Sequence, residues 1–209
     1  IHISTDYVFD GTGSFPYTED KTIAPIGVYG KTKASGEIAI KNRIEDFYIL
    51  RTSWLYGFSG RNFVYTMLRL MNSTPSLKVV NDQKGSPTFA SDLADVILKI
   101  IEASAVQKEN GRKIEIPYGI YNCTDIGEIT WYDFACEIKK LGIELGLIKN
   151  KDCVVRACST EEYPSLAKRP KYSVLCNKKI QNALGLKLPP WQESLRKFLE
   201  SPFFDKSRI

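Results

Sequence analysis

Apolar positions along the chain fall into two kinds of segment that alternate from one end to the other. Short apolar runs predict strands at 1–4, 47–51, 77–80, 119–123 and 152–157. Longer segments with apolar residues at helical spacing predict helices at 27–42, 63–71, 91–103, 131–145 and 191–199. Because strands and helices alternate in this way, the pattern predicts an α/β fold.

Several of these helices carry capping or packing signals. Ser91 and Thr130 stand where an N-cap is expected, ahead of the third and fourth helices. In the first helix we expect Ile38 to face the core. The third helix has one apolar stripe, made of Leu93, Val96, Ile97, Ile100 and Ile101. A polar loop is expected after it, over 102–113.

The composition is that of an ordinary globular protein. Of the 209 residues 43% are hydrophobic and 25% charged, so the chain can bury one substantial core or two small ones. There are 29 Lys and Arg against 24 Asp and Glu, and no basic run is long enough to predict a nucleic-acid partner. The mild positive charge favours an anionic partner such as a nucleotide sugar, although lysines on solvated helix faces account for it equally well.

The cysteines and the apolar content predict a cytoplasmic protein. The five cysteines form no CxxC pair, which is typical of free thiols in a reducing compartment. His2 is the only histidine, so no metal cluster is expected. No apolar stretch approaches twenty residues and no signal peptide is recognisable, so no membrane partner is expected.

Tyr29 and Lys33 are the most informative pair in the chain. In the run VYGKTKASGE they are four residues apart on a predicted helix, which places them on one face. A phenol is a poor acid near neutral pH, and a neighbouring ammonium favours its ionised form, which suits general acid–base work. Alone, such a pair is more often a half-buried tyrosine beside a solvated lysine.

The segment before Tyr29 favours the catalytic interpretation of the pair over the structural one. The run STDYVFDG, from Ser4 to Gly11, reads as the end of a strand that delivers hydroxyls and a carboxylate to a loop. A Ser or Thr at a strand end, followed by YxxxK on the next helix, is the arrangement of the short-chain dehydrogenase/reductases. Side chains alternate along a strand, so only one of Ser4 and Thr5 can point at such a site.

Further motifs make the resemblance specific. The chain resembles the dTDP-4-dehydrorhamnose reductases, which belong to the extended short-chain reductases. The motifs that carry it, beyond STDYVFDG and VYGKTKASGE, are RTSWLYG (51–57), NDQKGSPT (81–88), RPKYSVL (169–175) and LPPW (188–191). They follow one another over nearly the whole chain. One departure is Cys176, where the family usually has Asp.

The resemblance implies a role for each matched catalytic residue. Tyr29 would protonate the C4 oxygen of the sugar as a hydride arrives from the nicotinamide. Lys33 would bind the hydroxyls of the nicotinamide ribose and assist Tyr29, so both residues would also contact the cofactor. Thr5, which the family pattern favours over Ser4, would hydrogen-bond the substrate oxygen or Tyr29.

The resemblance also implies a set of substrate-binding residues. Asp6 would meet sugar hydroxyls, although a turn-capping aspartate is an equal alternative. Trp54 follows an apolar strand, where ligands bind in open α/β sheets, and would pack against the sugar. Asn62 and Arg169 would meet the nucleotide diphosphate, since an arginine can grip phosphate with two hydrogen bonds. Weaker candidates are Gln83 and, beside Arg169, Lys168.

The start of the chain departs from the family. Family members begin with a glycine-rich strand–turn–helix that cradles the cofactor pyrophosphate. Gly11 and Gly13 begin a GxG, but Pro16 follows and no helical pattern starts before Tyr29. We therefore expect a fragment that lacks the glycine-rich half and is inactive on its own.

The expected architecture is a partial Rossmann-like, NAD(P)-binding fold with a smaller α/β substrate-binding domain. Residues 1–58 would form the C-terminal part of the dinucleotide-binding domain. Residues 59–209 would form mainly the substrate-binding domain, with some segments returning to the Rossmann core.

The expected function is NAD(P)H-dependent reduction of the 4-keto group of dTDP-4-dehydro-β-L-rhamnose to dTDP-L-rhamnose. The cofactor would be NADPH or NADH. Some relatives dimerise and use Mg²⁺; a homodimer is therefore open, while no carboxylate cluster places a metal. The alternatives are a related nucleotide-sugar epimerase or dehydratase, and a non-catalytic binding protein that resembles the regulatory subunit of methionine adenosyltransferase.

Overall fold

Three parallel strands form the central sheet of the protein. A computed structural model describes residues 1–106, 116–163 and 167–209. The strands lie in the order β1 (His2–Thr5), β2 (Tyr48–Thr52) and β7 (Gly119–Asn122). His2 lies opposite Ile49, and Tyr48 lies opposite Gly119. β2 is buried along its whole length, as expected of the middle strand of a parallel sheet.

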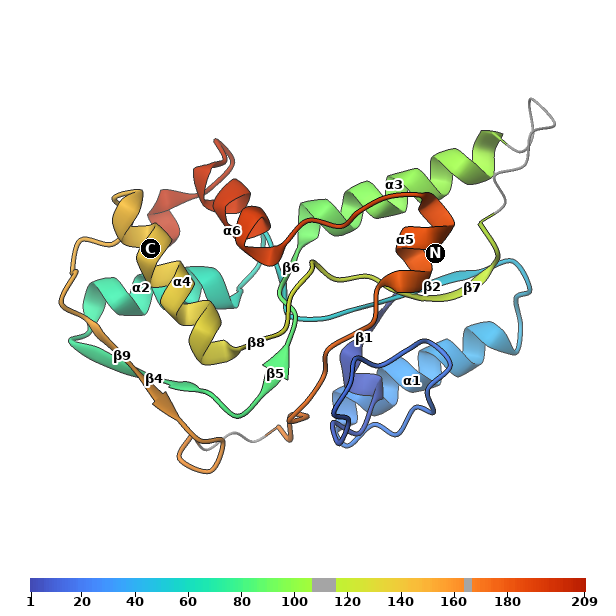
Figure 1. Ribbon diagram of the computed structural model, residues 1–209, viewed down its shortest axis with the longest axis horizontal. Helices are drawn as coiled ribbons and strands as arrows, with labels where there is room; N and C mark the ends of the chain where they lie inside the picture. Colours follow the sequence, from blue (N-terminus) through green and yellow to red (C-terminus); the bar gives the residue numbers. More distant parts are fainter. Residues whose placement is uncertain (107–115, 164–166) are drawn as a thin grey trace.

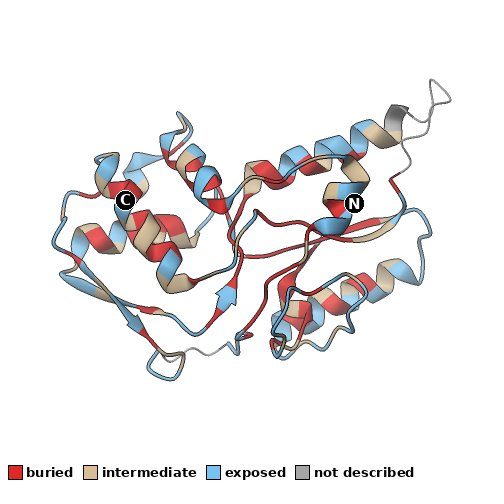
Figure 2. Ribbon diagram, viewed as in Figure 1, coloured by how far each residue is buried: buried red, intermediate tan, exposed pale blue. Residues whose placement is uncertain are grey.

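Helices cover both faces of this sheet (Figure 1). On one side lies α1 (Val28–Lys41), and on the other lie α3 (Ala90–Val106) and α5 (Lys178–Leu184). The sheet meets α3 and α5 through a cluster of buried side chains that includes Leu50, Val96, Ile100, Tyr121 and Ile180. Figure 2 shows β2 buried throughout, with the second halves of β1 and β7 buried beside it.

A second lobe packs beside the sheet, at the left of Figure 1. It contains α2 (Phe63–Ser73), α4 (Trp131–Glu144) and α6 (Trp191–Glu200), with the parallel pair β4 (Ser76–Val80) and β9 (Val154–Cys158). Its core is rich in aromatic side chains, among them Tyr56, Phe89, Phe134 and Phe198.

Short segments connect the two lobes and flank the candidate site. The parallel pair is β3 (Leu55–Tyr56) with β6 (Thr88–Phe89), and the antiparallel pair is β5 (Lys84–Gly85) with β8 (Ile129–Thr130). Two 3₁₀ turns are η1 (Asp6–Val8) and η2 (Lys206–Arg208). Within the described ranges no helix is long and apolar enough to cross a bilayer.

The predicted α/β, Rossmann-like class and all ten predicted elements are confirmed, with ends that differ by a few residues. Thr130 caps α4 as predicted, and Asp133 completes a capping box with it. The division into residues 1–58 and 59–209 stays a prediction, although β7 (Gly119–Asn122), α3 and α5 do lie against the central sheet. All five cysteines are free.

Four details were wrong. Ile38 is 50% exposed, because the buried face of α1 is formed by Gly30, Ala34 and Glu37. Ser91 lies inside α3, which starts at Ala90 directly after β6, so it is no N-cap. The polar loop expected over 102–113 begins inside α3, and its part from 107 onward lies outside the described residues. Ile101, at the edge of the α3 stripe, is 49% exposed.

Candidate active site

Gly30 brings α1 into close contact with the turn that follows β1. A Cβ atom on Gly30 would lie only 2.1 Å from the carbonyl oxygen of Tyr7, so no other residue fits without moving the helix. Next to it, the rings of Tyr29 and Tyr7 meet edge to face, with centroids 5.9 Å apart. The Tyr-Gly step of α1 therefore places the Tyr29 phenol beside η1.

Tyr29 faces an open cavity of about 430 Å³. The ring is 54% exposed, and Tyr7, Ile26 and Lys168 are among the other lining residues. Lys33 lies one turn further along α1, and its Nζ donates a hydrogen bond to the carbonyl of Ile3 at 2.8 Å. An ammonium has three protons to donate, so two remain for a ligand.

Ser4 and Thr5 point to different surroundings, as the alternation along a strand predicts. Ser4 donates to Glu37 Oε1 at 2.5 Å, and Glu37 also accepts two hydrogen bonds from Arg51, at 2.9 and 2.7 Å. All three side chains are buried, so Ser4 is enclosed in a structural network behind α1.

Thr5 occupies the end of β1 and caps η1. Its Oγ1 accepts a hydrogen bond from the Tyr7 amide at 3.3 Å and donates to Asp6 Oδ1 at 2.9 Å. No hydrogen bond between the described residues joins Thr5 to Tyr29. Thr5 is thus held by its own turn, in a position set by β1.

Asp6 is fully enclosed beside Thr5. Its Oδ2 is buried without a hydrogen-bond partner among the described residues. Burial raises the pKa of Asp6 to about 7, because a charged carboxylate is poorly solvated there. Burial also raises the pKa of Tyr7 to about 12, with Asp6 adding to the effect. A buried carboxyl of this kind can hold a proton near neutral pH.

Trp54 has an unusual backbone and a close aromatic partner. Its φ of 46° lies in the left-handed region, which a non-glycine residue rarely adopts. The indole stacks on Trp131, with centroids 3.6 Å apart and planes 10° apart. Its other neighbour is Gly85, where a Cβ atom would lie 2.4 Å from the indole. The partly buried indole is therefore fixed between β5 and α4.

Arg169 lines a second cavity, of about 400 Å³, that adjoins the first. Gln83 and Thr160 lie in its wall, and Gln83 donates to Thr160 Oγ1 at 2.9 Å. Ile26 and Lys168 line both cavities. The structure thus brings the RPKYSVL and NDQKGSPT segments next to the Tyr29 cavity.

Asn62 lies apart from these two cavities. It caps α2, accepting from the Tyr65 amide at 3.1 Å and donating to the Gly57 carbonyl at 2.8 Å. These bonds give Asn62 a structural role in addition to any contact with a ligand.

The side chains of the described residues suit a nicotinamide cofactor better than a metal ion. Within the described residues, no three His, Cys, Asp or Glu side chains lie together as a metal site requires. For a nicotinamide ribose the residues fit better: Lys33 has unused donors, and Tyr29, one turn before it on α1, is open to a cavity.

Sequence reasoning missed three features of this site. They are the close packing of Gly30 on Tyr7, the support of Trp54 by Trp131, and the buried pair of Glu37 and Arg51. The pair had a visible signal, since Arg51 ends an otherwise apolar strand and Glu37 lies one turn after Lys33. The stacking of Trp131 on Trp54 had no such signal in the sequence, because the two residues are 77 positions apart.

Comparison with known proteins identifies the family of the chain. The model of the RmlD substrate binding domain matches residues 1–202. The chain is 43% identical to a dTDP-4-dehydrorhamnose reductase of Aggregatibacter actinomycetemcomitans, over 94% of this chain and 64% of the relative.

Two solved structures are also similar. A reductase of the same description from Clostridium acetobutylicum superposes with a TM-score of 0.82 at 44% identity, over 95% of this chain and 64% of that chain. A dTDP-4-dehydrorhamnose reductase from Bacillus anthracis, in complex with NADP, superposes with a TM-score of 0.80 at 38% identity, with the same coverage of both chains. The chain thus spans 64% of the length of the proteins it matches here. It belongs to the family of the RmlD substrate binding domain.

Proposed function

We propose that the whole protein reduces the 4-keto group of dTDP-4-dehydro-β-L-rhamnose to give dTDP-L-rhamnose. The observation that carries the proposal is the position of Tyr29 and Lys33 one turn apart on α1, beside β1, where Lys33 bonds to Ile3 and Thr5 ends the strand. About 40% identity to named dTDP-4-dehydrorhamnose reductases supports this substrate.

In the proposed reaction Tyr29 delivers a proton to the C4 oxygen. Its exposed phenol lies at the start of α1 and is within reach of a ligand in the cavity. Lys33 places its ammonium one turn away, where a positive charge favours the phenolate that remains after proton transfer. Thr5 would orient the sugar oxygen, and its contact with Asp6 holds the hydroxyl in place.

NADPH is the proposed cofactor, and when bound it supplies the hydride. The NADP complex of the Bacillus anthracis relative supports NADPH over NADH. From this chain, Tyr29 and Lys33 would hold the nicotinamide ribose, with the two unused protons of Lys33 directed to its hydroxyls.

The proposed sugar nucleotide would lie across the two adjoining cavities. Trp54 would offer its indole to the rhamnose ring, whereas Asp6 stays a weaker candidate for a sugar hydroxyl because its carboxyl is enclosed. Arg169, in the second cavity, would pair with the diphosphate. Asn62 stays a weaker candidate, because its amide is already used in capping α2.

An epimerase or dehydratase would share Tyr29 and Lys33, so these two residues do not separate the enzymes. Trp54 and its packing on Gly85, within the reductase-like NDQKGSPT motif, favour the reductase. The same motif counts against a non-catalytic binding protein.

NADPH oxidation in the presence of dTDP-4-dehydro-β-L-rhamnose tests the proposal directly. In the whole protein, Tyr29→Phe should lower kcat at least a hundredfold, in the range that general acid catalysis contributes. Tyr118→Phe, an exposed tyrosine before β7, should leave kcat unchanged. Turnover by Tyr29→Phe at the rate of the wild type would overturn the proposed mechanism, and turnover of a UDP-hexose epimer pair instead would favour the epimerase.

A further inference from the structure

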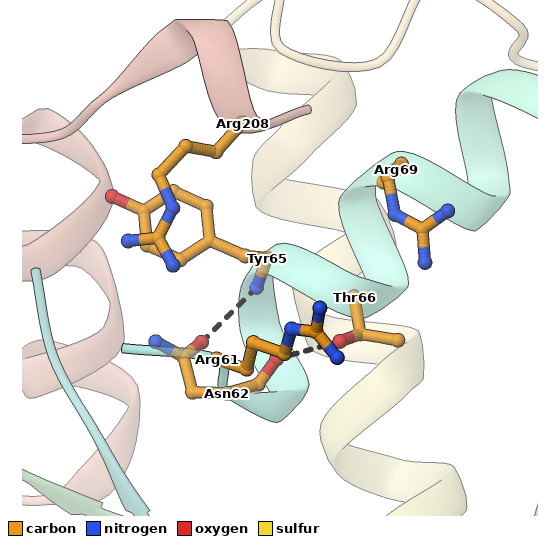
Figure 3. A pocket seen from close by; sticks show the side chains of 6 residues that line it. All are labelled: Arg61, Asn62, Tyr65, Thr66, Arg69 and Arg208. Carbon is orange, nitrogen blue, oxygen red and sulfur yellow. Dashed lines mark hydrogen bonds between the residues drawn. The ribbon is translucent and has the colours of Figure 1, made fainter. Parts of the chain in front are cut away.

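Three arginines surround a cavity of about 600 Å³ in the second lobe, away from the Tyr29 cavity. Figure 3 shows them with the other lining residues, and the complete set is Arg61, Asn62, Tyr65, Thr66, Arg69 and Arg208. The cavity shares no lining residue with the two cavities of the candidate active site. Its lining residues come from α2, the residues just before that helix, and the C-terminal turn η2.

Arg208 is fixed in place by neutral groups. Its Nη1 donates to the Phe58 carbonyl at 2.6 Å, its Nη2 donates to the Gly60 carbonyl, and the guanidinium lies over the Tyr65 ring at 4.0 Å. Carbonyls and an aromatic face orient a guanidinium without cancelling its charge. Arg208 therefore brings a preorganised positive charge to the cavity.

Arg61 and Arg69 have their charges uncompensated in the described part of the chain. Neither side chain takes part in a hydrogen bond or ion pair there, and both are exposed toward the cavity that they line. No carboxylate lines the cavity. The nearby acid, Asp205, accepts from the Ser207 hydroxyl and amide, and Arg208 helps to lower its pKa.

The chemistry that suits three guanidinium groups around one cavity is that of phosphate. Each guanidinium can form two parallel hydrogen bonds to phosphate oxygens, and such charge-assisted bonds are the stronger ones. The volume of the cavity falls in the range of small-molecule sites, which favours an anion larger than a single phosphate.

We propose that this cavity binds an anion that carries a diphosphate group, through Arg61, Arg69 and Arg208. The diphosphate can come from a nucleotide sugar or from a separate anion such as a free nucleotide diphosphate. The proposal does not depend on the reduction proposed above, because Tyr29, Lys33 and Thr5 do not line the cavity; Asn62, the weaker diphosphate candidate named above, does line it.

Calorimetric titration with inorganic pyrophosphate tests the site. Arg61→Gln and Arg69→Gln should each weaken binding roughly tenfold, which is about 1.4 kcal/mol. Arg43→Gln, exposed just after α1, is the control that should bind as the wild type does, and Arg169→Gln reports any pyrophosphate bound in the second active-site cavity instead. Arg208 is left intact, because it also joins η2 to the chain before α2.

Either of two results would overturn the proposal: no binding of pyrophosphate by the wild type, or binding that only Arg169→Gln weakens. A second titration, with dTDP-L-rhamnose in the presence of saturating pyrophosphate, identifies the source. Displacement of pyrophosphate that depends on Arg69 supports the diphosphate of the nucleotide sugar as the ligand. Simultaneous binding supports a separate anion at the same cavity.

Discussion

Trp54 and Trp131 stack face to face with their ring centroids 3.6 Å apart, although 76 residues separate them in the chain. Trp54 reaches this position through a backbone conformation that costs a non-glycine residue roughly 1–3 kcal/mol. Strain of this size is retained where the surroundings enforce it, and here Trp131 and Gly85 enclose the indole. The stack therefore preorganises one wall of the proposed sugar site.

Removing the support should weaken sugar binding without removing Trp54 itself. We expect Trp131→Ala to weaken binding of dTDP-L-rhamnose about tenfold, since the Trp54 indole would lose its fixed orientation. Trp131→Phe keeps an aromatic face and should restore most of the affinity. Equal affinities for wild type and Trp131→Ala, measured by calorimetry, would show that the stack serves only the fold.

Gly30 should be essential to the position of Tyr29. In Gly30→Ala the new methyl group would meet the Tyr7 carbonyl, so the start of α1 has to move away from η1. We expect kcat to fall at least tenfold in the whole protein, because proton transfer depends on geometry at the level of an ångström. Gly36→Ala, on the same helix, places its Cβ 3.6 Å from His2 and should leave kcat unchanged.

The pair of Glu37 and Arg51 should be important for stability rather than chemistry. Glu37→Ala would leave Arg51 buried and unpaired, and it would also deprive Ser4 of its acceptor. We expect a loss of about 3–5 kcal/mol in the free energy of unfolding, the usual cost of breaking a buried ion pair. Denaturant titration measures it, with Glu144→Ala, in an exposed pair with Arg196, as a control of small effect. A loss as small as that of the control would contradict the buried network.

Asp125 should make stability fall as pH rises. It is buried near α6, accepts from the Phe89 amide at 2.9 Å, and burial raises its pKa to about 7. Between about pH 4 and pH 7 the folded chain holds this proton and the unfolded chain does not, so stability decreases by at most about 1.4 kcal/mol per pH unit. Above pH 7 neither state holds it and the contribution becomes flat.

Asp6 has a similarly raised pKa, so both carboxyls contribute to the pH dependence of stability. Substituting Asp125 alone separates its contribution from that of Asp6. Asp125→Asn keeps an acceptor for the Phe89 amide and should show a shallower decline between pH 5 and pH 7. Thermal unfolding across that range tests it, with the exposed Asp152→Asn as control. Parallel curves for Asp125→Asn and the wild type would contradict the raised pKa.

Much of the fold could be predicted because local signals and tertiary packing agree. The Thr130 cap, the buried run of β2 and the apolar stripe centred on Val96 and Ile100 follow from spacing and side-chain type alone. α1 is the exception. On its inner face a buried glutamate, Glu37, stands where an apolar residue is expected. Apolar spacing alone therefore predicted the wrong face of the helix and placed Ile38, which is exposed, in the core.

The candidate site could be predicted only in part. Its motifs name Tyr29, Lys33, Thr5 and Trp54, but they do not say what holds these side chains in place. The supports are long-range contacts, such as Lys33 with the Ile3 carbonyl and Trp54 with Trp131, and these depend on how separate elements meet. The arginine cavity was missed for the same reason, because Arg208 joins Arg61 and Arg69 only in the folded chain.

The most direct test of the proposed sugar site is calorimetric titration of the protein with dTDP-L-rhamnose. The wild type should bind, and Trp54→Ala should bind about tenfold more weakly, a difference of about 1.4 kcal/mol. Tyr118→Ala, which removes an exposed aromatic side chain before β7, should bind as the wild type does. A folded wild type that does not bind, or a Trp54→Ala variant with unchanged affinity, would contradict a rhamnose site built on Trp54.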